Sequence, residues 1–453
     1  MIDDYASYDA LGLAALVAKG EVSPTELLDC AFDRVERLNP KLNAVVNPAP
    51  EVARRMIADG LPQGPFRGVP FLIKDLGIEA VDFPSDNGSR LLAGTRYPVD
   101  SAIYQRIRAA GLVTFARTAV PEGGVGPVTE AAVYGGPTRN PWDPDRTPGG
   151  SSGGSGAAVA AGIVPAAHGS DGGGSVRIPA SSCGLVGMKP TRARLPDGPY
   201  VGEGWAGMAM DGFLTRSLRD TAALLDGCMG CDLGAPYCPP PLGGTFMGAI
   251  GRPPGPLRIA VVPGTFTGGK IHPECRAAVE NTARLLEDLG HHVEETLPEA
   301  DSDAMLLAWT RIVACGTESW VRKAARTRGE SARELLEQVA RGACRMAGSV
   351  SGADYLDAVN RIHAYGRQMA AFFEDHDILL SATLAEPPAE IGRFAHSRAG
   401  FDDFQAYRMG SDGVFAYSPF TAAFNASGQP AISLPLHWTA DGLPACVEGC
   451  CEW

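Results

Sequence analysis

The sequence predicts an α/β fold in which strands and helices alternate around a buried sheet. A continuous apolar run at 68–73 is typical of a strand that is buried on both faces, and 257–262 is predicted as a further strand. Segments predicted to be helical, at 99–110 and 273–289, alternate with such runs. The chain has 453 residues, of which 45% are hydrophobic, so it can bury a large core.

Residues 1–60 are expected to be mainly helical. Ser23–Glu26 reads as a capping box with Pro24 at the first helical position. Apolar residues then recur at helical spacing as far as Leu38, and Asn39-Pro40 predicts the end of this helix. A short extended piece over 43–46 and a second helix over 50–59 follow.

The strand at 68–73 ends in Lys74-Asp75 and opens a catalytic core over 61–230. A proline- and glycine-rich surface connection is predicted over 234–256. Residues 257–440 would supply the remainder of the sheet and a helical region on the substrate side. We therefore expect one domain over 1–453. Further elements are predicted as strands at 112–116, 292–295, 378–380 and 431–435, and as helices at 220–229 and through most of 303–373.

Composition excludes several classes of function. The net charge of −13 provides no basic surface for nucleic acid. No secretory signal or membrane-spanning run is apparent, and the eleven cysteines follow no disulfide pattern, so a cytoplasmic protein is expected. Cys228, Cys231 and Cys238 lack a fourth zinc ligand and are interpreted as free thiols in a loop. We expect neither a metal nor a cofactor.

Thr147–Pro190 is the most unusual stretch, because it is rich in glycine, serine and alanine and holds few charges. Ser151 and Ser175 each follow a glycine cluster, and an alanine-rich segment over 157–167, predicted to be helical, lies between them. Glycine inside regular structure costs about 0.5–1 kcal/mol relative to alanine, so clustered glycines indicate positive φ or close backbone approach. This stretch is interpreted as an active site.

Lys74 is a candidate general base, since burial at a strand end would favour its neutral amine. The alternative is a structural lysine whose amine reaches solvent. Ser151 formally matches a G-x-S-x-G nucleophile elbow, which would require a histidine such as His437; a simple glycine–serine turn is the other interpretation. Ser175 is the stronger nucleophile candidate, because Gly172–Gly174 can present consecutive N–H groups to an oxyanion. Together these residues suggest Ser–Lys catalysis.

The chain resembles the amidase signature family in PGGSSGGSGAA at 148–158 and SDGGGSVRIPASSCGLVGMKP at 170–190, with further matches at 68–75, 214–220 and 425–435. The resemblance implies a large mixed central β-sheet covered by helices on both faces. It also implies hydrolysis of an amide through an acyl-enzyme, without cofactor or metal. Its implied site comprises the nucleophile Ser175, the relay Ser151 after a cis peptide bond, the base Lys74, an oxyanion hole from the N–H groups of Gly172, Gly173, Gly174 and Ser175, and the supporting residues Asp171 and Arg177.

The resemblance is greatest to bacterial amidases of small apolar, aryl or oligomeric amides, including cyclic nylon oligomers. It implies a place for Cys315 in the substrate pocket, although an ordinary buried helical cysteine is an equal interpretation. Ile178 stands where amidotransferase subunits carry glutamine, which disfavours that role. A catalytically impaired binding subunit and a Ser–His–Asp esterase are further alternatives. A small-molecule amide is the expected partner, and a homodimer is left open.

The end of the chain departs from the family pattern. After Asp441–Pro444 the family continues with a strand and a closing helix, whereas this chain reads ACVEGCCEW. We interpret this as a frameshift or truncation that removes a core strand and exposes a sheet edge.

Overall fold

The computed structural model describes residues 4–451 and contains one mixed sheet of eleven strands. The strands are β1 Val45–Val46, β2 Pro70–Lys74, β3 Val113–Thr118, β4 Ala166–Asp171, β5 Val186–Lys189, β6 Met210–Thr215, β7 Arg258–Val261, β8 His292–Glu295, β9 Ile378–Ala382, β10 Ala431–Leu434 and β11 Val447–Cys451. Their order across the sheet is β1-β3-β2-β4-β6-β5-β10-β11-β9-β7-β8. Parallel pairs join β2 to β3 and β4, and β7 to β8 and β9; the other pairs are antiparallel. The predicted α/β class is confirmed.

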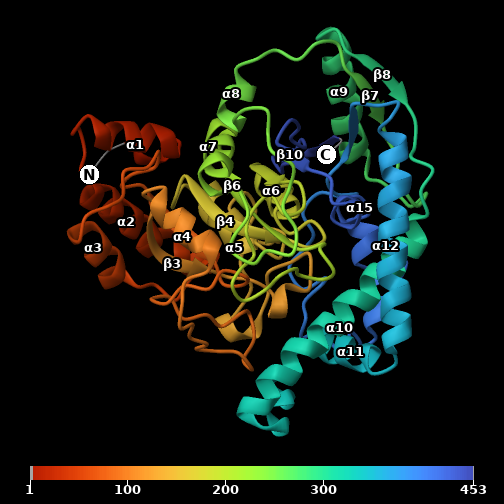
Figure 1. Cartoon of the computed structure of the whole chain (residues 1–453), viewed down its shortest axis with the longest axis horizontal. Helices are drawn as coiled ribbons and strands as arrows, with labels where there is room; N and C mark the ends of the chain where they lie inside the picture. The colour runs from red at the N-terminus through yellow and green to blue at the C-terminus, as the bar shows by residue number, and fades with distance from the viewer. Residues whose placement is uncertain (1–3, 452–453) are drawn as a thin grey trace.

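Fifteen α-helices in the described part of the chain pack around this sheet. The N-terminal helices lie at one end of the molecule, and α10, α11 and α12 lie at the other (Figure 1). The helices are α1 Ala10–Ala18, α2 Pro24–Leu42, α3 Pro50–Ala58, α4 Ala102–Ala109, α5 Gly153–Ala160, α6 Arg177–Cys183, α7 Leu218–Cys228, α8 Phe246–Ile250, α9 Pro273–Asp288, α10 Ser302–Arg328, α11 Gln338–Ala347, α12 Gly352–Phe372, α13 Phe404–Met409, α14 Val414–Tyr417 and α15 Thr421–Ser427. No helix within residues 4–451 is both long and apolar enough to cross a bilayer.

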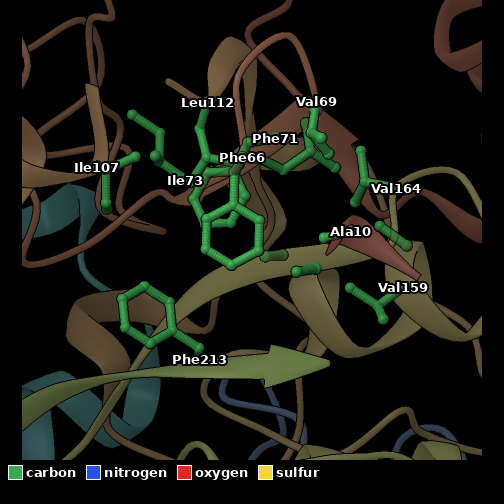
Figure 2. Close-up of a cluster of buried hydrophobic side chains, with 14 of the residues drawn as sticks. Ala10, Phe66, Val69, Phe71, Ile73, Ile107, Leu112, Val159, Val164 and Phe213 are labelled. Atoms are coloured by element: carbon green, nitrogen blue, oxygen red, sulfur yellow. The ribbon is translucent and has the colours of Figure 1, made fainter. Parts of the chain in front are cut away.

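Strand β2 is buried along its whole length and lies between β3 and β4. Figure 2 shows Phe71 and Ile73 of this strand in a cluster that also contains Phe66 and Phe213. Each such side chain contributes about 1.5–3 kcal/mol when it leaves water. This packing holds the end of β2, and therefore Lys74, in the interior.

Helix α2 starts with the predicted capping box but does not end at Asn39-Pro40. It continues through Pro40 to Leu42 and stops at Asn43, which has a left-handed φ of 49°. Proline removes one N–H donor from inside the helix, and the helix ends two residues after it. The Asn39 side chain accepts the N–H groups of Ala44 and Val45, which secures the exit of the chain.

Only the first four residues of the alanine-rich run at 157–167 are helical. Helix α5 ends at Ala160, and the chain re-enters the sheet as β4 from Ala166. Alanine favours helix by a few tenths of a kcal/mol per residue, and burial between β2 and β6 outweighs that preference. The expectation of a helix to Ala167 is wrong for this reason.

The expectation of a missing core strand at the C-terminus is also wrong. Val447–Cys451 forms β11, which pairs antiparallel with β10 on one side and β9 on the other. This strand therefore links the two halves of the sheet. Glu448, an unusual residue for a central strand, is completely buried there.

One expectation about the cysteines is wrong as well. Cys231 and Cys238 are joined by a disulfide, with their Cα atoms 5.6 Å apart. The loop after α7 folds back and brings the two residues within bridging distance. Cys228, at the end of α7, is a buried free thiol as predicted.

Candidate active site

Lys74 ends β2 with a fully buried side chain. Its Nζ lies 2.7 Å from Ser151 Oγ, 2.9 Å from Ser170 Oγ and 3.2 Å from the Ser170 carbonyl oxygen. Burial lowers the pKa of Lys74 to about 7, although the charge of Asp171, and that of Asp211 when it is ionised, oppose this shift. The structure thus brings the predicted base to one predicted serine, and the alternative of a solvent-reaching lysine is wrong.

Ser151 lies in the loop that leads into α5. The peptide bond Gly150–Ser151 is cis, as the resemblance implies. Its hydroxyl bonds to Lys74. The histidine of the esterase alternative is engaged elsewhere, since His437 Nε2 lies 2.8 Å from Glu274 Oε2.

Ser175 is half-buried in the turn between β4 and α6. The N–H of Ser152 donates to the Ser175 carbonyl oxygen at 3.2 Å, so the two serine-bearing loops are in direct contact. Ser175 also lines a cavity of about 20 Å³, together with Gly173 and Ile178. A nucleophile at this position would face that cavity.

The glycines before Ser175 are required by what surrounds them. A Cβ on Gly172 would lie 2.5 Å from the Trp205 ring, and one on Gly173 would lie 2.7 Å from Trp309. Gly174 has a φ of +122°, which side chains rarely adopt. Trp309 is anchored because its Nε1 donates to the Gly172 carbonyl oxygen at 2.9 Å.

The loop offers fewer free donors than the sequence predicted. The N–H of Gly174 donates to Asp171 Oδ1 at 2.7 Å, which takes Gly174 out of the predicted oxyanion hole. Within residues 4–451, no hydrogen bond engages the N–H groups of Gly172, Gly173 or Ser175. These three groups are the remaining candidates for binding an oxyanion.

Replacement of Gly173 by alanine tests whether the N–H group of this residue helps to bind the oxyanion. The new Cβ would collide with the anchored Trp309 ring and move the Gly173 N–H group, so we expect amide-hydrolysing kcat/KM to fall by about 10²–10³-fold. Gly136→Ala is the matched control, because its Cβ meets nothing within 4 Å. Equal rates for the two variants, both with native melting temperatures, would contradict this account of the loop.

Asp171 and Arg177 hold the glycine loop at 172–174 in place through hydrogen bonds, in the supporting role that the resemblance implies. Arg177 Nε and Nη2 donate to Asp171 Oδ2 and Oδ1 at 3.0 and 2.9 Å. Arg177 also bonds to Asn425 Oδ1 at 2.7 Å and to Glu448. The Arg177 guanidinium holds the pKa of Asp171 well below its usual range, whereas burial raises the pKa of Glu448 to about 7. Asn425 and Glu448 were missed from the sequence, since nothing local ties them to a loop more than two hundred residues earlier.

His168 and Asp211 form a second missed group beside Lys74. The backbone N–H of Lys74 points to His168 Nδ1 at 3.4 Å, and His168 Nε2 lies 3.1 Å from Asp211 Oδ1. If Nδ1 accepts, the neutral ring carries its proton on Nε2 and donates it to Asp211. Burial lowers the pKa of His168 and raises that of Asp211 to about 8, so both groups favour their neutral forms.

The cavity at Ser175 is lined mainly by glycines and apolar side chains, three of which are aromatic. Trp205, Trp309 and Phe415 line it together with Arg408. Cys315 lies half-buried on α10 and is not among the lining residues, so its place in a substrate pocket stays a prediction. In the part of the chain that the structure describes, no group of three histidine, cysteine or acidic side chains is arranged to hold a metal ion.

Comparisons with known proteins agree with this fold. A family model described as Amidase matches residues 26–449. The chain is 38% identical over 449 residues to a 6-aminohexanoate-cyclic-dimer hydrolase of Paenarthrobacter ureafaciens, covering 97% of this chain and 90% of that protein. A solved structure of 6-aminohexanoate cyclic dimer hydrolase complexed with substrate superimposes with a TM-score of 0.92 at 37% identity, over 99% of this chain and 94% of that one. A bacterial aryl acylamidase superimposes with a TM-score of 0.87 at 28% identity, over 98% and 92% of the two chains.

Proposed function

Because the chain belongs to the amidase signature family, whose members cleave carbon–nitrogen bonds, we propose that it hydrolyses an amide through an acyl-enzyme on Ser175. Ser151 would relay protons and Lys74 would be the base. The observation that supports this most strongly is the 2.7 Å contact between Lys74 Nζ and Ser151 Oγ in a buried site.

The proposed reaction moves one proton along this chain of groups. Neutral Lys74 takes the hydroxyl proton of Ser151 as Ser151 takes that of Ser175, whose oxygen then attacks the amide carbonyl. The N–H groups of Gly172, Gly173 and Ser175 stabilise the oxyanion. The proton returns through Ser151 to the leaving amine, the C–N bond breaks, and an ester to Ser175 remains. Water, activated by the same relay, hydrolyses this ester to a carboxylic acid and regenerates the enzyme.

The pH dependence tests the role of Lys74. The base works only when its amine is neutral, and its pKa is lowered to about 7. We therefore expect kcat/KM for an anilide to rise with pH through a midpoint near 7 and to be lost progressively below it. The measurement is the initial rate of aniline release across the pH range in which circular dichroism shows a folded protein. A midpoint above pH 9, that of an ordinary exposed lysine, would contradict the proposed base.

The proposed substrates are small apolar or aryl amides and cyclic or linear oligomeric amides. This range rests on the largely apolar, partly aromatic lining of the cavity and on the names of the similar proteins, a cyclic-dimer hydrolase and an aryl acylamidase. The contact between Lys74 and Ser151 disfavours an impaired binding subunit, and Ile178 at the cavity disfavours an amidotransferase subunit. A hydrolysis screen over primary, aryl, peptide and cyclic amides would rank the substrates. A homodimer and a cytoplasmic location stay predictions.

A further inference from the structure

Arg408 is a buried cation in the wall of the same cavity as Ser175. It lies on α13 and is only 3% exposed. Aromatic rings surround its guanidinium, whose carbon lies 4.8 Å from the ring centre of Trp309, 5.2 Å from that of Phe404 and 5.9 Å from that of Phe415. These rings stabilise the cation in part but offer it no negative charge.

No carboxylate or carbonyl oxygen within residues 4–451 pairs with this guanidinium, and its Nε is buried without any hydrogen-bond partner. The other three buried arginines are satisfied: Arg117 and Arg194 donate to backbone carbonyls, and Arg177 donates to carboxylates. None of the residues that line the cavity is acidic. Arg408 is therefore exceptional among the buried arginines in this part of the chain.

An unpaired buried charge is costly. Burial lowers the pKa of Arg408 to about 10, against the opposing influence of Tyr407, and the group still carries its proton at neutral pH. A guanidinium presents N–H donors in a fixed plane that matches the two oxygens of a carboxylate. A ligand carboxylate would supply the missing partner.

We propose that Arg408 is a specificity-determining residue that binds a carboxylate of the substrate, so that the preferred amides carry a free carboxylate a short distance from the scissile bond. This inference rests on the proposed function, because the geometry that supports it is the shared cavity of Arg408 and Ser175. Because Ser175 and Arg408 line the same cavity, a carboxylate bound to Arg408 would lie a short distance from the reacting carbonyl.

Paired substrates that differ only in this charge provide the test. A series of dicarboxylic acid monoanilides of increasing chain length, each with its methyl ester, places the carboxylate on the acyl side. N-acyl amino acids and their methyl esters place it on the amine side. We expect the wild-type chain to favour the acid over its ester in one series by about 10- to 100-fold in kcat/KM, the effect of a hydrogen-bonded charge pair.

Arg408→Met should bring this acid-to-ester ratio to about one, and Arg408→Lys should leave an intermediate ratio. Arg393→Met is the matched control, since Arg393 also lies over aromatic rings but pairs with Glu386 and Asp412. It should keep the wild-type ratio. If Arg408→Met fails to fold, the acid-to-ester ratio of kcat/KM for the wild-type chain tests the proposal by itself.

A wild-type chain that hydrolyses acids and esters equally, or an Arg408→Met ratio unchanged from wild type, would overturn this inference. A simple neutral anilide distinguishes failure of the Arg408 proposal from failure of the proposed amide hydrolysis. Turnover of that anilide without preference for acids would overturn the role of Arg408 alone, whereas absence of all amide turnover would overturn the proposed function and this inference with it.

Discussion

Alanine in place of Ser175 is expected to lower kcat/KM for an amide by about 10⁴-fold or more, because no other hydroxyl in the structure both lines the cavity and follows the glycine loop. The loss should fall on kcat, since the acyl-enzyme cannot form. The measurement is amine release under single-turnover and steady-state conditions, with melting temperature as the check on folding. Ser175 contributes no side-chain hydrogen bond to the described structure, so the variant should stay folded.

Ser349→Ala, on an exposed turn, is the control for this substitution and should retain wild-type rates. Retention of more than about a tenth of the wild-type rate in the Ser175 variant would assign the nucleophile elsewhere. Ser151 would then become the first alternative, as in the esterase interpretation.

Replacement of Arg177 by methionine is expected to lower the free energy of unfolding by about 3–5 kcal/mol, the range for removing one partner of a buried ion pair. It would leave the carboxylates of Asp171 and Glu448 buried without their cation. Because Asp171 holds the Gly174 N–H, activity should fall with stability. Urea unfolding monitored by tryptophan fluorescence measures the change.

Arg258→Met is the matched control for Arg177. Arg258 pairs with Asp377 in a similar two-bonded arrangement, but the pair is exposed, with 48% and 36% of the two side chains accessible. Exposed pairs contribute about 0–1 kcal/mol. Similar losses of unfolding free energy in the two variants would show that the buried ion pairs of Arg177 stabilise the protein no more than an exposed pair does.

The sequence predicted the parts of the site that are carried by local patterns. An apolar strand that ends in lysine, and serines behind glycine clusters, are visible in short windows; these gave Lys74, Ser151 and Ser175. The structure brings Lys74 to Ser151 because β2 is buried between β3 and β4. Glycine is required at 172–174 because Trp205 and Trp309 leave no room for a side chain and Gly174 has a positive φ, as well as because the loop must present N–H donors.

What the sequence could not predict depends on contacts between distant segments. Glu448 lies where the sequence predicted the loss of a strand, and its buried carboxylate is paired with Arg177 on α6, more than two hundred residues earlier. Arg408 resembles any arginine on a short helix until the aromatic wall around it is seen. The run at 157–167 was misjudged because alanine propensity is weak compared with burial in the sheet.

Covalent labelling of the wild-type chain tests the central claim most directly. A fluorophosphonate reacts with an activated serine, and peptide mass mapping locates the adduct. The account predicts a single adduct on the peptide that contains Ser175, formed faster as the pH rises through about 7, where Lys74 becomes neutral. An adduct on Ser151 instead, or none on Ser175 in a protein that hydrolyses amides, would contradict it.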